Sequence, residues 1–152
     1  MSEERQGRDS ERPPFTQHAG LALKVAREES FSRGHNYIGQ EHLLLAFQRD
    51  PECTAARVFS SIGFDARAPV EFLIGDGAGF PTAEPGLTPR AARALGLAYA
   101  EARRLQDVKL DTAHILLGML KEGEGIGSGV LREGGIGVDE IETALATVER
   151  EL

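Results

Sequence analysis

Two histidines, His42 and His114, are the side chains of this sequence best suited to act as a general base or a metal ligand. Each comes just before a run of leucines, at the expected start of an internal helix. No motif ties either histidine to a nucleophile or an acid, and the single cysteine, Cys53, excludes a multi-thiolate metal site. We therefore expect two buried, hydrogen-bonded structural histidines, a packing role for Cys53, and no catalytic site, metal or cofactor.

The two histidines occupy the same place in an internal duplication. When residues 15–75 are laid over residues 87–147 without a gap, at an offset of 72, many identical residues coincide. The identical pairs include Thr16 with Thr88, Ala22 with Ala94, Glu29 with Glu101, His42 with His114 and Gly63 with Gly135. Apolar positions coincide as well, which is the pattern that a shared core leaves when surfaces diverge. The sequence therefore predicts two copies of one folding unit.

Each copy is expected to form four short helices. The first helix of each copy follows a threonine N-cap, Thr16 or Thr88, and Gly34 ends the first of them. Gly63 and Gly135 are expected to be left-handed C-caps of the third helices. The second helices are predicted at 40–47 and 112–120, the third at 52–61, and the fourth near Asp65 and Asp139. Because no stretch alternates apolar and polar residues with a period of two, the fold class is all-α, with essentially no sheet.

The composition shifts along the chain predict its organisation. Residues 1–14 are polar and end in two prolines, so they are expected to form a disordered leader. The first repeat then spans 15–75, a glycine- and proline-rich linker spans 76–86, and the second repeat spans 87–152. A unit of about 60 residues buries little surface alone. We expect the two repeats to pack face to face, with pseudo-twofold symmetry, into one compact domain.

The charge and the apolar pattern exclude several classes of protein. A net charge of −7 is inconsistent with general nucleic-acid binding, which needs a concentrated basic surface. No apolar run approaches the roughly 20 residues that span a bilayer, and the N-terminal residues do not resemble a signal peptide. A cytoplasmic location, without a membrane partner, is expected.

The segments that surround the histidines are similar to a known family. The stretch His35–Leu44 and its echo Val108–Leu117 resemble the Clp repeat, the N-terminal domain of the Clp unfoldases. The resemblance covers residues 15–150 and implies an eight-helix pseudo-dimeric domain that receives substrates or adaptors above a hexameric motor. No phosphate-binding loop Gly-x4-Gly-Lys-Ser/Thr occurs in this sequence, and the glycine run 123–129 indicates only a flexible loop and a weak helix start. A stand-alone form without the ATPase motor is therefore expected.

Some Clp N-domains bind phosphorylated arginine, and the resemblance implies which residues would do so here. A glutamate would take the guanidinium group, while a threonine cap and a basic residue would hold the phosphate. The first repeat has Glu41 and Thr16 but carries His18 at the basic position. The second repeat has Thr88 and Arg90, but Ala113 replaces the glutamate. On this interpretation each repeat holds part of a site, and the first repeat is favoured.

The resemblance also implies an adaptor surface in the crevice between the repeats, where Phe15, Phe80 and Leu87 would form an apolar patch. The preferred hypothesis is a non-enzymatic, monomeric module of a Clp chaperone-protease system. It would bind adaptor or substrate proteins and either deliver them to the Clp components or compete with the motor's own N-domain. The alternatives are a protein that sequesters a cyclic-peptide antibiotic and an enzyme that uses His42 or His114.

Overall fold

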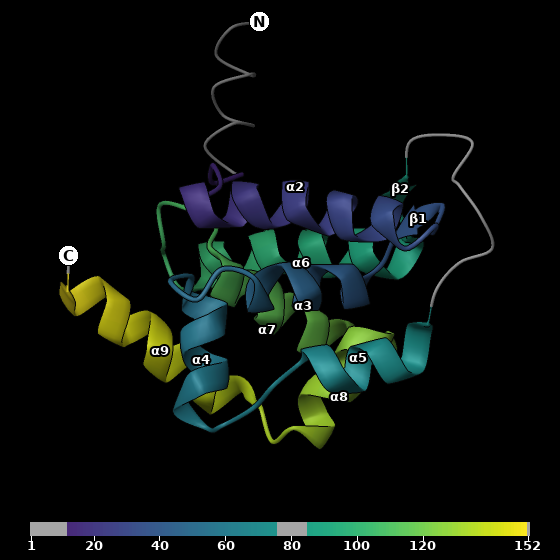
Figure 1. The fold of residues 1–152 in the computed structure, drawn as a ribbon. Coiled ribbons are helices and arrows are strands. Elements are labelled where there is room, and N and C mark those ends of the chain that lie inside the picture. The colour runs from purple at the N-terminus through teal and green to yellow at the C-terminus, as the bar shows by residue number, and fades with distance from the viewer. Residues whose placement is uncertain (1–11, 76–84, 152) are drawn as a thin grey trace, which may run out of the picture.

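The computed structural model describes residues 12–75 and 85–151, and within them the chain forms eight helices, as predicted (Figure 1). The first repeat contains α2 (Gln17–Ser32), α3 (Gln40–Gln48), α4 (Thr54–Ser61) and α5 (Arg67–Ile74). The second repeat contains α6 (Pro89–Arg104), α7 (Thr112–Glu122), α8 (Ile126–Glu133) and α9 (Val138–Glu151). The all-α prediction is confirmed.

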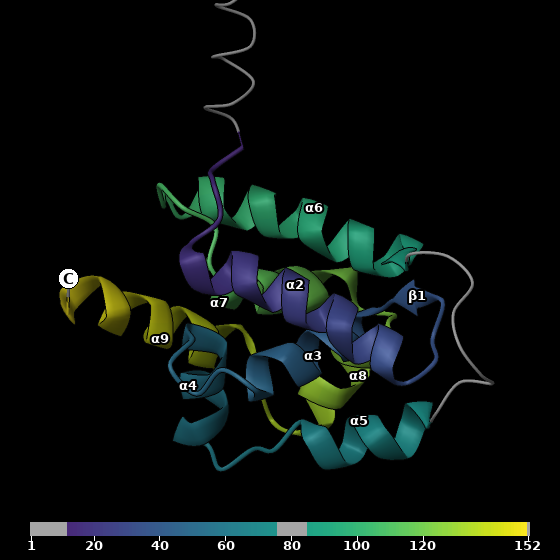
Figure 2. The ribbon, with the colours of Figure 1, turned by 45° about the horizontal axis from the view of Figure 1, so that its top comes forward.

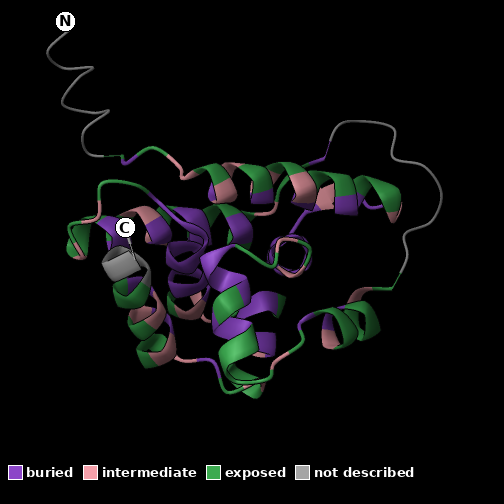
Figure 3. Ribbon diagram, turned by 60° about the vertical axis from the view of Figure 1, so that its left-hand side comes forward, coloured by how far each residue is buried: buried purple, intermediate pink, exposed green. Residues whose placement is uncertain are grey.

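The helices of the two repeats interdigitate instead of forming two separate bundles. α2 and α6 run along one side of the molecule, α3 and α7 lie in its centre, and the pairs α4 with α9 and α5 with α8 close its two ends (Figures 1 and 2). α4 packs on α7 of the other repeat, and α8 packs on α3. Buried residues concentrate in the centre (Figure 3), where Leu43–Phe47 and Ile115–Leu117 are almost completely inaccessible. Neither repeat could therefore bury its core without the other.

A short parallel sheet, which the sequence did not predict, crosses the boundary between the repeats. Strand β1 (Tyr37–Ile38) pairs with strand β2 (Gly86–Leu87), and the Thr88 N–H donates to the Ile38 carbonyl at 2.9 Å. The equivalent pairing at the opposite end joins Phe15 to Leu110, and the Thr16 N–H donates to the Leu110 carbonyl at 2.9 Å. Two-residue strands are too short to leave a sequence period, which explains why they escaped prediction.

The predicted helix caps are confirmed with small changes in bounds. The Thr16 and Thr88 hydroxyls each accept a backbone N–H at 3.1 Å, from Ala19 and Ala91 respectively. Gly63 and Gly135 adopt φ of 70° and 80°. The third helix begins later than predicted, at Thr54, because Cys53 caps it.

The domain boundaries lie partly outside the described residues. The structure describes neither residues 1–11 of the predicted leader nor residues 76–84 of the predicted linker. Gly86, assigned to the linker from the sequence, belongs to β2, and the Pro14 carbonyl accepts the Leu110 N–H at 2.8 Å. The pairing across the repeats thus includes residues on both sides of the predicted boundaries.

Both histidines have the structural role that was predicted for them. The Nδ1 atoms of His42 and His114 accept the backbone N–H of the residue that caps their helix, at 2.9 and 2.8 Å. Each Nε2–H then donates to the residue seven positions earlier, which is His35 at 2.8 Å in the first repeat and Asp107 at 2.7 Å in the second. Since both nitrogens of each ring are engaged inside the protein, neither ring is available as a base or a ligand.

Helices α6 and α7 approach each other closely because small residues line their contact. A Cβ atom at Gly118 of α7 would collide with the Ala94 carbonyl oxygen of α6 and lie 2.9 Å from the Ala98 nitrogen. Both obstacles are backbone atoms, so only a shift of the helices could relieve the collision.

Replacing Gly118 with alanine should destabilise the protein by about 1–3 kcal/mol. Gly96→Ala is the matched control, because nothing lies within 4 Å of a Cβ at this α6 position. The control should gain up to about 1 kcal/mol of stability from helix propensity. Chemical unfolding of both variants measures the difference, and equal stabilities would contradict the close approach of the two helices.

Acid should destabilise the protein through His42. Burial, followed by the proximity of His35 and Arg33, lowers the pKa of His42 from 6.5 to about 4. The unfolded chain therefore binds more protons than the folded chain between these values, so stability falls as the pH falls from 6.5 to 4, by about 3 kcal/mol from this residue.

The second repeat supplies the matching variant for this pH effect. His35→Asp copies Asp107 and gives His42 a carboxylate partner, which should raise its pKa and reduce the loss of stability over this pH range. Unfolding free energies measured from pH 7 to pH 4 test this expectation. An unchanged pH dependence in the variant would show that His42 does not cause the loss.

Candidate functional site

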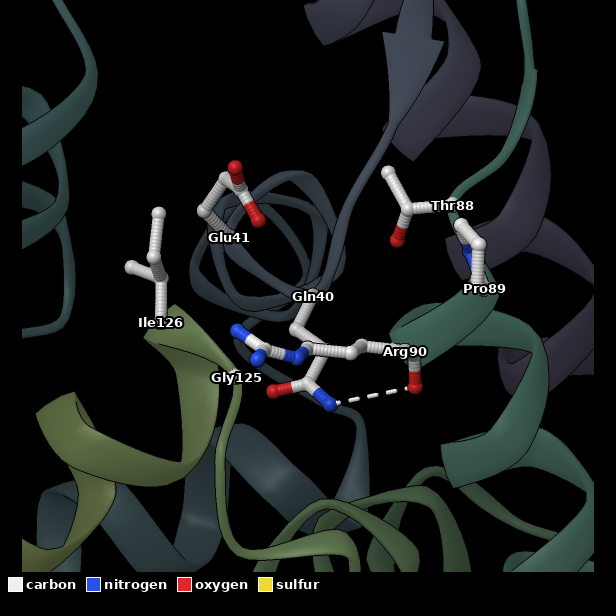
Figure 4. Close-up of a pocket in the computed structure, with 7 residues that line it drawn as sticks. All are labelled: Gln40, Glu41, Thr88, Pro89, Arg90, Gly125 and Ile126. Atoms are coloured by element: carbon white, nitrogen blue, oxygen red, sulfur yellow. Dashed lines mark hydrogen bonds between the residues drawn. The ribbon is translucent and has the colours of Figure 1, made fainter.

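A cavity of about 320 Å³ opens where three helix N-termini from both repeats converge (Figure 4). Gln40 and Glu41 come from the first turn of α3. Thr88, Pro89 and Arg90 come from the start of α6, and Gly125 and Ile126 come from the start of α8. Helix N-termini carry partial positive charge and free N–H groups, so their convergence favours an anionic group in the cavity.

Glu41 supplies a buried carboxylate at this cavity. Glu41 is only 6% exposed, and this burial raises the pKa of the carboxyl group. A hydrogen bond from the Glu41 backbone N–H and the proximity of His35 partly oppose the shift. Within the described part of the chain, no ion pair engages Glu41. A Cβ atom at Gly39 would collide with the carboxylate, so glycine at this position lets the group fold back against the start of α3. A buried acceptor without a cation is costly unless a ligand supplies the partner.

Arg90 supplies the opposite charge at the mouth of the same cavity. Its side chain extends from α6 toward α8 (Figure 4). It is 60% exposed and contacts Glu124 through an ion pair of 3.8 Å and a hydrogen bond of 3.2 Å to the backbone carbonyl. An exposed ion pair of this length contributes little energy. Arg90 can therefore exchange this contact for an anionic ligand.

Gln40 forms the floor of the cavity, and no local sequence pattern predicts this role. Its amide nitrogen donates to the Arg90 carbonyl at 3.2 Å and to Glu122 at 2.8 Å, and its oxygen accepts the Ser128 N–H at 3.2 Å. Cβ atoms at Gly125 and Gly127 would collide with the Gln40 side chain. The glycine run, predicted as a flexible loop and a weak helix start, contains the ordered start of α8 and admits this side chain.

The predicted site residues are brought together in a different combination. Glu41 of the first repeat shares its cavity with Thr88 and Arg90 of the second repeat. Thr16 does not join Glu41. Thr16 caps the N-terminal end of α2, whereas Glu41 follows the C-terminal end of that helix, and the Thr16 hydroxyl donates to Asp111 of the second repeat at 2.8 Å. α2 has 16 residues and so extends for roughly 24 Å. The assignment of one partial site to each repeat was therefore wrong, and the pairing of strands between the repeats explains why.

The predicted apolar patch is also divided. Phe15 is half-buried and stacks on Tyr99 with ring centroids 5.9 Å apart, whereas Leu87 is 42% exposed in β2. They occupy equivalent positions at opposite ends of the domain, so they do not form one surface. Phe80 lies outside the described residues.

Within 12–75 and 85–151, no helix is both long and apolar enough to cross a bilayer. The same residues contain no group of three or more histidine, cysteine, aspartate or glutamate side chains that could hold a metal ion.

Curated relatives share the sequence over most of this chain. It is 41% identical over 132 residues to the chloroplastic chaperone protein ClpC1 of Oryza sativa subsp. japonica, which covers 85% of this chain and 14% of that protein. It is 39% identical over 132 residues to the ClpA homolog of Guillardia theta, described as an ATP-binding subunit of the ATP-dependent Clp protease, with 85% and 16% covered. The chain thus spans a small part of the length of these relatives.

Solved structures share the fold. The N-domain of ClpV from Vibrio cholerae matches with a TM-score of 0.75 and 18% identity over 88% of this chain and 84% of that one. The Hsp104 N-terminal domain from Candida albicans matches with a TM-score of 0.69 and 20% identity, over 86% and 88%. The sequence itself matches the Clp repeat (R) N-terminal domain over residues 14–134 and 86–152. The chain therefore belongs to the family of Clp repeat N-terminal domains.

Proposed function

We propose that this chain is a binding module of a Clp chaperone system and that its cavity takes phosphorylated arginine side chains of proteins. The observation that carries the proposal is that the Glu41 carboxylate and the Arg90 guanidinium face one cavity from different repeats, and that no ion pair engages Glu41 among the residues that the structure describes. Phosphoarginine has the complementary arrangement, with a cationic guanidinium next to an anionic phosphate. Clp N-terminal domains are the substrate- and adaptor-binding modules of Clp ATPases, which agrees with a protein ligand.

The two ends of the ligand meet different chemistry. Glu41 accepts the guanidinium N–H groups in a charge-assisted contact, which the low exposure of the carboxylate strengthens. Arg90 and the N-termini of α6 and α8 receive the phosphate. Thr88 accepts the Ala91 N–H, and its hydroxyl hydrogen has no acceptor within the described residues, so it can donate to the phosphate as well. Unmodified arginine lacks the anion, and phosphoserine lacks the guanidinium.

A bound peptide fits the family and the surface. A structure similar to this one, with a TM-score of 0.69 and 19% identity, is described as a complex of the ClpV N-domain with a VipB peptide. The cavity opens to solvent beside Ile126, which is 40% exposed, so a side chain can enter while its backbone remains outside. We propose that the chain presents such proteins to the motor as a cytoplasmic monomer. No described feature favours the alternative of sequestering a cyclic-peptide antibiotic.

Glu41→Gln should abolish most of the binding of a phosphoarginine peptide. Losing one charged acceptor costs about 1.5–3 kcal/mol, which corresponds to roughly a 10- to 150-fold weaker affinity. Glu124→Gln is the control, because it removes only the exposed partner of Arg90 and should leave the affinity equal or higher. Calorimetric titration with phosphoarginine, arginine and phosphoserine peptides measures the effect. Equal affinity for the three peptides, or unchanged binding by Glu41→Gln, would reject the proposal.

Gly39→Ala should weaken binding by a different route. Its new Cβ atom displaces the Glu41 carboxylate, which is the flexible end of a side chain, while the backbone at position 39, with φ of −100°, accepts alanine. We expect at least a tenfold loss of affinity with a stability change below about 1 kcal/mol. Gly20→Ala, where nothing lies within 4 Å of the added Cβ atom, is the control for a glycine replacement. Wild-type affinity in Gly39→Ala would show that the position of the carboxylate is unimportant.

A further inference from the structure

The pseudo-twofold symmetry of the fold places a region equivalent to the Glu41 cavity at the opposite end of the domain. The Glu41 cavity is the first corner of the domain, and the equivalent region is the second corner. Subtracting or adding the offset of 72 maps each residue of the cavity onto its counterpart at the opposite end of the domain. The counterparts of Gly39, Glu41, Thr88, Arg90 and Ile126 are Asp111, Ala113, Thr16, His18 and Thr54, respectively. The pairing of Ile38 with Leu87 at the first corner recurs as the pairing of Leu110 with Phe15 at the second, so the backbones correspond there and the side chains can be compared position by position.

At the second corner the carboxylate has moved and is fully engaged by the protein. Asp111 stands where the first corner has Gly39, and its two oxygens accept the hydroxyls of Thr16 at 2.8 Å and Thr54 at 2.5 Å. Ala113, at the position of Glu41, is completely buried and offers no acceptor. Thr54 is 5% exposed, whereas its counterpart Ile126 is 40% exposed at the edge of the first cavity. Internal contacts therefore fill the place where a guanidinium group would bind.

The phosphate end of the second corner is also occupied. His18, in the position of Arg90, is held by Asp50, with 2.6 Å between its Nδ1 atom and the Asp50 carboxylate. The hydroxyl of Thr16 donates to Asp111, so it cannot donate to a ligand, in contrast to that of Thr88. An anion entering this corner would meet the carboxylates of Asp50 and Asp111.

We propose that each chain binds one phosphorylated arginine, at the Glu41 corner, and that Asp111 closes the opposite corner. This inference rests on the proposed function and adds its stoichiometry. A protein segment with a single modified arginine is then a sufficient partner. A second phosphoarginine on the same peptide raises the affinity only by the statistical factor of about two, because the described residues offer no second site for avidity.

Calorimetric titration of the intact chain with free phosphoarginine tests both statements separately. The inference is supported if one ligand binds per chain, if Arg90→Ala weakens the affinity at least tenfold, and if the matched variant His18→Ala keeps the wild-type affinity. Two ligands per chain, or equal losses in both variants, overturns it while leaving the proposed function standing. The absence of any binding overturns the proposed function, and the inference with it.

A second experiment rebuilds the lost corner. The triple variant His18→Arg, Asp111→Gly, Ala113→Glu copies Arg90, Gly39 and Glu41 of the first corner at their equivalent positions, and the number of ligands per chain should rise from one to two. A folded variant that still binds one ligand would overturn the assignment of these residues. If the variant fails to fold, amide shifts of the wild-type chain decide the matter. Shifts at Glu41 and Thr88 without shifts at Thr16 and Ala113 support the inference, and the reverse overturns it.

Discussion

The reciprocal backbone pairing between the repeats determines the rest of this structure. The residues that lead into α6 lie beside the strand that precedes α3, and the residues that lead into α2 lie beside the segment that precedes α7. As a result, the threonine cap of each repeat stands next to the second helix of the other repeat. Any site at these positions is built from both repeats, and it exists only when the whole domain is folded.

The two corners show how a duplicated unit can lose one site and keep its fold. At one corner Glu41 remains a buried carboxylate that forms no ion pair with any described residue, which is the kind of local cost that proteins retain for function. At the other corner Asp111 is the N-cap residue of α7, and its carboxylate accepts the hydroxyls of Thr16 and Thr54, so these contacts contribute to stability. The histidines add a parallel example, since His114 binds a carboxylate where His42 binds another histidine.

Much of the fold could be predicted from the sequence, because each signal for it was local. Threonine caps, glycine C-caps and leucine spacing located the helices, and the hydrogen-bonded histidines followed from their place at helix starts. The combination of site residues could not be predicted, because two-residue strands set it and leave no period in the sequence. The role of Gln40 could not be predicted for a related reason, because its hydrogen-bond partners are 50 to 88 residues away in the chain.

In the proposed complex one cavity spans the two repeats and holds both ends of a single ligand. A crystal structure of the intact chain with phosphoarginine would test this arrangement. We expect one ligand, with its guanidinium on Glu41 of the first repeat and its phosphate at Arg90 and Thr88 of the second. A ligand that contacts residues of only one repeat, or that lies between Thr16 and Ala113, would contradict it.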